Sequence, residues 1–295
     1  MKDLARRTVF ITGGAQGIGL GMARAFARAG ARLALADLDE ERLQSAKREL
    51  LALAGDGSAV AVFPLDVRDR DAFTRVVDAA ENRLGPIAVL CNNAGLGFLT
   101  PIRALRYEQW DHVLDVNLGG VINGVQTVLP RMLDRGGPGH IVNTASGAGL
   151  IATTNVTYVT SKFAVVGMSE SLRIQPELIA NGIGVTVVCP GLVRTNVTLN
   201  SARAEERQDP SAEEGHALLQ RYGLDPDVVG DQVLEAILAD KLYVHTDRYV
   251  APLIEERMRS LMEALPAETE RDRELAPLLR ARLAAQSERV QVHDG

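Results

Sequence analysis

The sequence has few of the features that mark a membrane, nucleic-acid-binding or disulfide-rich protein. Its two cysteines, Cys91 and Cys189, lie far apart in apolar runs, so neither a disulfide scaffold nor a metal site is expected. It has no apolar run of about 18 residues and no apolar leader before Thr12, which argues against a membrane partner. With a net charge of −6 and no block of Lys and Arg, nucleic acid is not an expected partner either. These absences predict a globular protein of the reducing cytoplasm.

The composition that is present is that of an ordinary globular protein. The 295 residues are 46% hydrophobic and 24% charged, which excludes disordered, collagenous and coiled-coil proteins. Length alone suggests about two domains, although one α/β domain can use the whole chain. A chain of this size buries roughly 75% of the surface that its unfolded form exposes, so it needs no disulfide or metal to stay folded.

Short apolar runs alternate with amphipathic stretches through the first two thirds of the sequence. The runs are too short for helices and are typical of buried strands. Helical spacing predicts long helices around Tyr107–Asp134 and Thr157–Ala180, and a seventh strand within Leu242–Val250 is interrupted by polar residues. The six clearer strands are expected at Thr8–Thr12, Leu33–Ala36, Ala59–Leu65, Ile87–Cys91, His140–Thr144 and Gly184–Cys189.

This alternation predicts the fold class. Short connections between strands and helices imply right-handed crossovers and parallel pairing. We therefore expect an α/β protein with a single doubly wound domain of three layers, in which helices cover both faces of a mostly parallel seven-stranded sheet. Such a fold binds its ligand at the C-terminal ends of the strands, so the residues at these ends are the candidate site.

Two segments do not follow the alternation. Asn200–His216 has five acids, two arginines and no large apolar residue, which predicts a mobile loop. The charged segment after Glu255 predicts solvated helices with a frayed end. Surface decoration, a lid and an oligomer contact are the open interpretations. The expected organisation is a catalytic domain at 1–254 with a substrate lid at 195–225, followed by a helical extension at 255–295.

A glycine-rich turn, TGGAQGIG, follows the first expected strand at Thr12–Gly19. Glycine at 13, 17 and 19 permits a tight turn and a close approach of the backbone to a pyrophosphate. The next helix offers free N–H groups and the positive end of its dipole. The spacing differs from the common G-x-G-x-x-G, so the turn matches that fingerprint in mechanism and not in letters.

Asp37 ends the second expected strand, 24 residues after Gly13. A carboxylate there accepts hydrogen bonds from the ribose hydroxyls of a dinucleotide and repels a 2′-phosphate. Neither Gln16 nor Leu38 offers a compensating positive charge. NAD is therefore favoured over NADP, with Arg42 the only nearby basic residue that could reverse the preference.

Polar and small residues also follow the later strands. Asp66-Val67 follows the third strand and Asn92–Gly95 (NNAG) follows the fourth, and both suit tight turns close to a ligand. Ser146 follows the fifth strand, twelve residues before Tyr158. These positions would all meet at one edge of the predicted sheet.

Tyr158 and Lys162 are spaced four residues apart on one predicted helix, so the ammonium can lie near the phenol. An ordinary tyrosine titrates near pH 10. A cation about 4 Å away, at an effective dielectric constant of about 20, is worth roughly 4 kcal/mol or about three pKa units. The pair is therefore expected to bring the pKa of Tyr158 near neutrality, where the phenol acts as an acid and base.

Taken in chain order, these motifs resemble the short-chain dehydrogenase/reductase family in its simple-domain branch. The resemblance covers about residues 5 to 198 and implies a Rossmann-type dinucleotide-binding fold. The motifs that carry it are TGGAQGIG, Asp37, Asp66-Val67, NNAG, Asn117 in DVNLGG, Ser146, Tyr158 with Lys162, and PGLVRT at Pro190–Thr195.

The resemblance implies four catalytic residues. Tyr158 would remove the alcohol proton, or return it in reduction. Lys162 would lower the pKa of Tyr158 and bind the nicotinamide ribose. Ser146 would hydrogen-bond the substrate oxygen, and Asn117 would hold a water that relays protons between Lys162 and solvent.

The resemblance also implies a nicotinamide cofactor, with NAD expected and NADP less favoured. Thr195 and the backbone of Val193 would anchor the carboxamide, and Asp66 with Val67 would border the adenine. The cofactor-binding set is Gly13, Gln16, Gly17, Ile18, Gly19, Asp37, Leu38, Asp66, Val67, Asn93, Ala94, Gly95, Tyr158, Lys162, Pro190, Gly191, Val193 and Thr195.

The expected substrate is a hydrophobic secondary alcohol or ketone. Ile122–Leu150 resembles bacterial dehydrogenases that oxidise benzylic alcohols in lignin-derived aryl ethers. An NADPH-dependent carbonyl reductase and a non-catalytic NAD(H)-binding protein are the alternatives. The residues expected around the substrate are Ser146, Leu150, Val156, Leu192, Val197 and Leu199.

Two departures from the family pattern bear on these expectations. Ala145 stands where many relatives have a second serine, which should be harmless. Pro176 should kink or shorten its helix beyond Lys162. A homodimer or homotetramer is expected, although the helix faces that often form the dimer contact include this altered helix.

Overall fold

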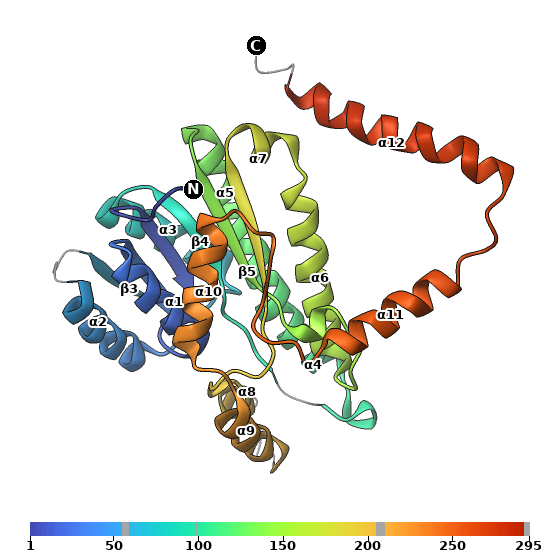
Figure 1. The fold of residues 1–295 in the computed structure, drawn as a ribbon. Helices are drawn as coiled ribbons and strands as arrows, with labels where there is room; N and C mark the ends of the chain where they lie inside the picture. The colour runs from blue at the N-terminus through green and yellow to red at the C-terminus, as the bar shows by residue number, and fades with distance from the viewer. Residues whose placement is uncertain (55–58, 98–99, 205–209, 292–295) are drawn as a thin grey trace.

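Seven parallel strands form one central sheet in the computed structural model, which describes residues 1–54, 59–97, 100–204 and 210–291 (Figure 1). The strand order is β3-β2-β1-β4-β5-β6-β7, so the winding reverses between β1 and β4. The expected sheet is confirmed, and every strand pair is parallel. The strands are β1 (Thr8–Thr12), β2 (Arg32–Asp37), β3 (Val60–Pro64), β4 (Ile87–Asn92), β5 (Gly139–Thr144), β6 (Ile183–Cys189) and β7 (Tyr243–His245).

The last strand is shorter than the sequence suggests. Only Tyr243–His245 pairs with β6, and the chain then turns away from the sheet. The Thr246 hydroxyl accepts a hydrogen bond from the backbone N–H of Gly191 at 2.9 Å, which holds the chain beside the end of β6. The polar residues after His245 therefore form a turn over the strand ends and do not extend the strand.

Helices cover both faces of the sheet, as expected for a doubly wound domain (Figure 1). Apolar side chains of α1, α2 and α10 pack on one face, and those of α3 and α5 pack on the other. The helices are α1 (Gly17–Arg28), α2 (Glu40–Ala54), α3 (Arg70–Leu84), α4 (Tyr107–Leu114), α5 (Gly120–Arg135), α6 (Val156–Arg173), α7 (Pro176–Ala180), α8 (Val197–Ala204), α9 (Pro210–Tyr222), α10 (Pro226–Leu238), α11 (Ala251–Glu263) and α12 (Glu270–Gln291), with short turns η1 (Ile102–Ala104), η2 (Asp115–Gly119, π-helical) and η3 (Gly147–Gly149).

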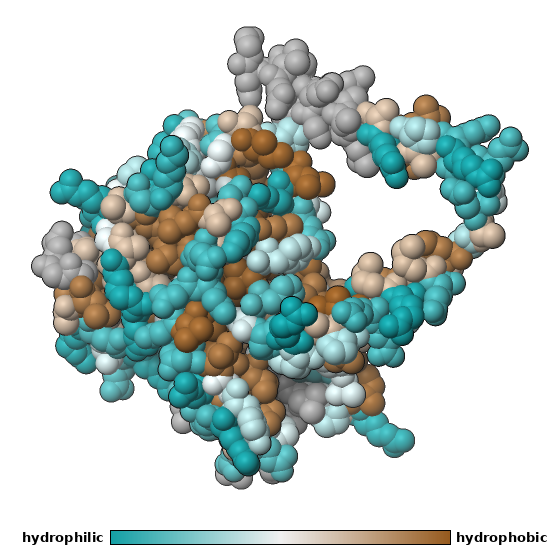
Figure 2. Space-filling model, in the orientation of Figure 1, coloured by the Kyte–Doolittle hydropathy of each residue, from teal (hydrophilic) through white to brown (hydrophobic). Residues whose placement is uncertain are grey.

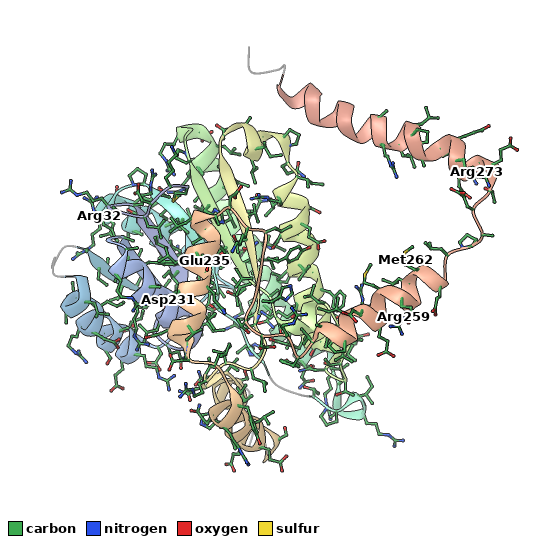
Figure 3. All side chains as sticks on the ribbon, viewed as in Figure 1. Arg32, Asp231, Glu235, Arg259, Met262 and Arg273 are labelled. Atoms are coloured by element: carbon green, nitrogen blue, oxygen red, sulfur yellow. The ribbon has the colours of Figure 1, made fainter. Side chains whose placement is uncertain are left out.

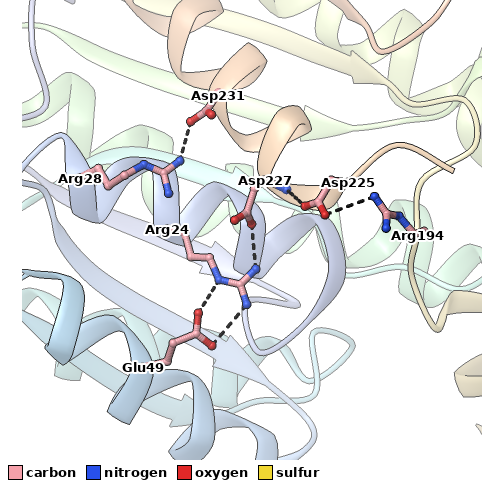
Figure 4. Close-up of polar contacts among 7 residues, drawn as sticks. All are labelled: Arg24, Arg28, Glu49, Arg194, Asp225, Asp227 and Asp231. Atoms are coloured by element: carbon pink, nitrogen blue, oxygen red, sulfur yellow. Dashed lines mark hydrogen bonds and ion pairs between the residues drawn. The ribbon is translucent and has the colours of Figure 1, made fainter. Parts of the chain in front are cut away.

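Helices α1 and α10 approach each other closely because glycine faces glycine where they cross. A β-carbon on Gly21 would lie 2.1 Å from the carbonyl oxygen of Pro226, and one on Gly230 would lie 2.2 Å from that of Gly21. Ion pairs flank the crossing: Arg24 binds Asp227 at 2.8 Å, and Arg28 binds Asp231 at 2.6 Å (Figure 4).

The prediction of a mobile loop at Asn200–His216 is wrong for the residues that the structure describes. Residues 200–204 belong to α8 and residues 210–216 belong to α9, while 205–209 lie outside the described residues. The two helices bury Ser201, Ala212 and Leu219. These small residues, together with Leu219 just after Asn200–His216, bury enough surface to hold both helices on the body. The lack of large apolar residues in this segment therefore does not prevent helix formation.

Both long helical patterns are interrupted. Residues 107–135 form α4, the π-helical turn η2 and α5 in succession. The expected effect of Pro176 is confirmed, because α6 ends at Arg173 and Pro176 is the first residue of α7. Proline is well suited to this first position, where its missing N–H has no helical partner to lose.

The chain after Val250 leaves the sheet, although part of α12 returns close to α7. Helices α11 and α12 form an arm, residues 251–291, that projects from the body of residues 1–250 (Figures 1 and 3). No residue of α11 is buried, and apolar atoms lie along its surface (Figure 2). The solvated helices expected here are thus present, and the frayed end at 292–295 lies outside the described residues. None of the described helices is both long and apolar enough to span a membrane.

Candidate active site

A cavity of about 440 Å³ opens at the C-terminal ends of the parallel strands, where the fold is expected to bind its ligand. Most residues that the sequence analysis singled out lie on its wall. Those on the wall are Gly13, Gln16, Gly17, Ile18, Asp37, Leu38, Asp66, Val67, Asn93, Ala94, Gly95, Ser146, Tyr158, Lys162, Pro190, Gly191, Val193, Thr195 and Val197. Those not on the wall are Gly19, Asn117, Leu150, Val156, Leu192 and Leu199.

The glycine-rich turn forms part of the cavity wall, and larger residues at its glycine positions would not fit its backbone conformation. Gly13 and Gly17 have positive φ angles of 62° and 54°, which favour glycine. A β-carbon on Gly19 would lie 2.1 Å from the carbonyl oxygen of Gly13, so this residue closes the turn from behind. The N-cap residue Gln16 makes no side-chain hydrogen bond to the first turn of α1. The N–H groups of this turn are therefore available to an anionic group.

Asp37 is held in place by backbone groups on both sides. Its Oδ2 accepts a hydrogen bond from Ala15 N at 3.1 Å, and its Oδ1 accepts one from Asp39 N at 3.2 Å. Burial raises the pKa of the carboxyl, and these two hydrogen bonds oppose the shift. The carboxylate therefore faces the cavity from a fixed position at the end of β2.

Two arginines lie on the same part of the wall, so Arg42 is not the only nearby basic residue, contrary to expectation. The Nε of Arg42 lies 3.1 Å from an oxygen of Asp39. Arg68 pairs with Asp66 at 2.7 Å, and this hydrogen-bonded pair lowers the pKa of the Asp66 carboxyl. Each arginine is therefore already neutralised by a carboxylate of its own.

Asn93 connects the ends of three strands. Its side-chain N–H groups donate to the carbonyl oxygens of Thr12 and Gly13, both at 3.2 Å. Its Oδ1 accepts a hydrogen bond from the Thr144 hydroxyl at 3.2 Å. The residue thus holds the glycine-rich turn against the ends of β4 and β5, which explains why an amide is required there.

Ser146, Tyr158 and Lys162 lie together on the wall of the cavity. A side-chain hydrogen bond joins Ser146 and Tyr158. The Lys162 ammonium donates to the carbonyl oxygen of Thr144 at 3.0 Å and lies 5.6 Å from the centre of the Tyr158 ring. The residues come from two elements, the turn after β5 and helix α6, and the spacing of Tyr158 and Lys162 on α6 brings both into contact with the turn.

The expected lowering of the Tyr158 pKa is wrong for the protein by itself. Burial raises the pKa of the phenol above its usual value, and the hydrogen bond with Ser146 only partly opposes this. Burial also lowers the pKa of Lys162 to about 8. Desolvation is the largest cause of both shifts, and for Tyr158 it outweighs the hydrogen bond with Ser146.

Asn117 lies behind the cavity wall in the π-helical turn and is fully buried. Its Oδ1 accepts from Leu96 N at 2.7 Å, and its Nδ2 donates to Leu96 O at 3.0 Å and to the Ser161 hydroxyl at 3.2 Å. The amide therefore joins the segment after β4 to helix α6. A proton-relay water at Asn117 stays a prediction.

The substrate side of the cavity differs from the expected set. Val156 is exposed, and Leu150 packs against a separate apolar cluster under α6. Apolar residues from α8, α9 and the segments after β4 take their place. The wall residues that the sequence analysis did not single out include Leu96, His112, Val116, Asn200 and Leu219. The period of buried Ala212 and Leu219 along α9 could have indicated the last of these.

Comparisons with known proteins agree with this architecture. The family model described as short chain dehydrogenase matches residues 7–206. A C alpha-dehydrogenase from Sphingobium sp. is 32% identical over 274 residues, which are 90% of this chain and 88% of that protein.

Two solved structures extend the similarity to the fold. A short-chain dehydrogenase from Novosphingobium aromaticivorans superposes with a TM-score of 0.82 at 35% identity, covering 98% of this chain and 99% of that one. A short-chain dehydrogenase/reductase from Burkholderia phymatum, solved in complex with NAD, has a TM-score of 0.83 at 28% identity and covers 91% of this chain and 99% of that one. The expected resemblance is confirmed: the chain belongs to the short-chain dehydrogenase/reductase family of oxidoreductases, which use a nicotinamide cofactor.

Proposed function

We propose that the protein is an NAD-dependent oxidoreductase that transfers a hydride between nicotinamide and a hydrophobic secondary alcohol or ketone, with Tyr158 as the acid and base. One observation carries the proposal. A dinucleotide-type glycine turn and a Ser–Tyr–Lys group lie on the wall of the same cavity. A protein that only bound the cofactor would need the turn and not the proton-transfer group.

The residues present fit a dinucleotide. Glycine lets the turn pack closely, because a β-carbon on Gly13 would lie 2.9 Å from Ala94 Cα and one on Gly17 would lie 3.1 Å from Thr195. The first turn of α1 offers N–H groups to the charge of a pyrophosphate. Thr195 and Val193 line the cavity, with Thr195 beside Gly17, and would hold the carboxamide end. When bound, the nicotinamide supplies the position that accepts or gives up the hydride.

The protein's own residues supply the proton path. Ser146 would orient the substrate oxygen by a hydrogen bond, and the Tyr158 hydroxyl would take the alcohol proton or return it to the ketone. Lys162, protonated at neutral pH with a pKa of about 8, would stabilise the phenolate as it forms. Its hydrogen bond to Thr144 O keeps the ammonium at the cavity wall.

The charges around Asp37 support NAD over NADP. The carboxylate lies where it would accept bonds from ribose hydroxyls and repel a 2′-phosphate. Arg42 and Arg68 are both paired with neighbouring carboxylates. A 2′-phosphate would have to break one of these pairs to gain a cation.

The apolar wall supports a hydrophobic substrate. Leu96, Val116, Val197 and Leu219 line the cavity, and Val197 and Tyr158 both lie within 4 Å of the position that a β-carbon on Gly97 would take. The similar C alpha-dehydrogenase from Sphingobium makes a benzylic alcohol a reasonable member of this class. A sugar or a charged acid would leave its polar groups without partners on such a wall.

Helices α8 and α9 would act as the substrate lid at 195–225. The Ser201 hydroxyl accepts a hydrogen bond from Gly97 N at 2.8 Å, and Asn200 lies 3.5 Å from Arg42. These contacts hold α8 over the cavity from two sides. We further propose a catalytic domain at 1–254 with an extension at 255–295, a cytoplasmic location and a homodimer or homotetramer.

A panel of secondary alcohols and ketones, assayed with NAD and with NADP by nicotinamide absorbance, tests the proposal. We expect NAD-linked turnover of hydrophobic alcohols and weaker binding of NADP. Binding of NAD without turnover of any alcohol or ketone would identify a non-catalytic NAD(H)-binding protein. Tighter binding of NADP would instead indicate a carbonyl reductase and contradict the role of Asp37, which the Asp37→Ser variant checks by its expected gain in NADP affinity.

A further inference from the structure

The turn after β7 lies against the wall of the cavity, although the sequence analysis assigned it no role. Gly191 on the cavity wall donates its N–H to the Thr246 hydroxyl at 2.9 Å. A β-carbon on Gly191 would lie 1.9 Å from Oδ2 of Asp247 and 2.6 Å from Cε1 of Tyr249. The Tyr249 ring therefore packs directly on the backbone of Gly191, where no larger residue would fit.

The hydroxyl of Tyr249 lies beside a second part of the site. A β-carbon on Gly147, the residue after Ser146, would lie 3.9 Å from this hydroxyl oxygen. A negative charge on Tyr249 also raises the pKa of the Tyr158 phenol, so the two phenols are close enough to interact. Tyr249 thus spans the two turns that follow β5 and β6, next to the proton-transfer group.

The ring of Tyr249 is available to a ligand. It is 56% exposed, and its hydroxyl makes no hydrogen bond to another described residue. Tyr243, six residues earlier, is the useful contrast, because its hydroxyl is bound to Glu170 on the surface of α6. One tyrosine is thus tied to the surface of the body, and the other presents a free ring edge beside the cavity.

The segment that carries Tyr249 is anchored without its ring. Val250 is 4% exposed and packs against Gly147, and Ala251 N donates to Arg248 O at 3.0 Å. Substitution of the ring should therefore leave the turn and helix α11 in place. This makes Tyr249 a position where a change in substrate preference can be separated from a change in folding.

We infer that Tyr249 is a specificity residue, whose ring contacts the substituent on the reacting carbon and favours secondary alcohols with an aromatic ring over those with a saturated ring. The inference rests on the proposed function and names the substrate class of the same site. A phenyl group can pack edge to face or offset against the tyrosine ring, whereas a cyclohexyl group of similar size lacks the complementary charge distribution. Tyr249 does not itself line the cavity, so its ring would meet the substrate where the substituent extends past Gly191 on the wall.

Methyl phenyl carbinol and methyl cyclohexyl carbinol form a matched substrate pair for the test. With NAD, we expect the wild type to favour the phenyl compound by up to about tenfold in kcat/KM, the scale of one aromatic pair. The Tyr249→Leu variant should lose this preference through a higher KM for the phenyl compound, with kcat for the cyclohexyl compound unchanged. Tyr249→Phe keeps the ring and should keep the preference, and Tyr243→Phe should match the wild type.

An unchanged phenyl preference in Tyr249→Leu would overturn the inference. A second measurement, binding of methyl phenyl ketone and methyl cyclohexyl ketone in the presence of NADH, separates this failure from failure of the proposed function. If neither alcohol is oxidised but Tyr249→Leu still weakens phenyl ketone binding selectively, the proposed function fails and the Tyr249 contact stands. If no variant changes the binding of either ketone, the contact is excluded whatever the turnover.

Discussion

The body and the arm of this protein both contain amphipathic helices, yet only the body has buried residues, as far as burial is described (residues 251–281 of the arm). In the body, Met22 and Phe26 of α1 are fully buried against the sheet. In the arm, no residue of α11 is buried, and Met262 is 62% exposed (Figure 3). The cavity and its proton-transfer group belong to the body, so its packing should set both stability and activity. The arm should matter to the site only through its attachment to the turn after β7, which belongs to the body.

The largest effect should come from the charged group inside the body. Lys162→Met removes the ammonium that would stabilise the Tyr158 phenolate, so kcat/KM should fall by about 10²- to 10⁴-fold. The matched control is Lys241→Met, because Lys241 is exposed and pairs only with Glu235 on α10. Activity of Lys162→Met within threefold of the wild type would show that the charge plays no part in proton transfer.

The glycine crossing of α1 and α10 tests the packing of the body. A Gly230→Ala side chain would lie 2.2 Å from Gly21 O, so the free energy of unfolding should fall by about 3 kcal/mol or more. Gly167→Ala on α6 is the control, since its side chain would meet nothing within 4 Å and should stabilise the helix by roughly 0.5–1 kcal/mol. Urea unfolding measures both, and equal effects would exclude the close crossing.

A buried histidine should make the stability of the body depend on pH. His140 is fully buried beside Thr186, and burial lowers its pKa from 6.5 to about 4, against the attraction of Asp240. As the pH falls, His140 therefore takes up a proton in the unfolded chain before it does so in the folded protein. The stabilisation of the fold by the neutral imidazole is complete above pH 6.5. As the pH falls to 4, about 3 kcal/mol of the free energy of unfolding is lost.

His140→Gln isolates this contribution from that of the carboxylates. Its free energy of unfolding should fall less steeply than that of the wild type between pH 6.5 and 4, whereas His245→Gln, at an exposed position, should follow the wild type. Parallel pH curves for wild type and His140→Gln would mean that the buried imidazole titrates normally.

The smallest effect on stability should come from the arm. Met262→Lys lies on the exposed face of α11, so the free energy of unfolding of the body should change by less than about 0.5 kcal/mol. Met22→Ala in α1 should cost about 2–5 kcal/mol in the same urea experiment. A loss above about 1 kcal/mol in Met262→Lys would show that the arm is packed, and the comparison between the two regions would fail.

Most of the fold could be predicted because the buried strands are continuous apolar runs with short connections. β1 has the expected bounds, and β4 and β6 differ from them by one residue. The error at Asn200–His216 has a physical cause. Helices α8 and α9 bury small residues such as Ser201 and Ala212, and composition alone does not distinguish these from loop residues.

The positions of site residues could be predicted where the sheet topology determines them, and could not be predicted where long-range packing determines them. Parallel strands bring Asp37 and Ser146 to one edge whatever the details, and the helical spacing brings Tyr158 next to Lys162. Leu219 reaches the cavity wall, and Tyr249 reaches Gly191 on that wall, through long-range packing of later segments, which no local pattern encodes. The pKa of Tyr158 was missed for a related reason, because desolvation depends on everything that surrounds the ring.

The Tyr158→Phe variant tests the central claim most directly, measured by turnover of a hydrophobic secondary alcohol with NAD alongside NAD affinity. The phenol hydroxyl would carry the proton, while most of the groups that would hold the cofactor, the glycine turn and Asp37 among them, stay unchanged in this variant. We expect turnover to be abolished and NAD binding to stay nearly intact. Turnover retained in Tyr158→Phe would contradict the account.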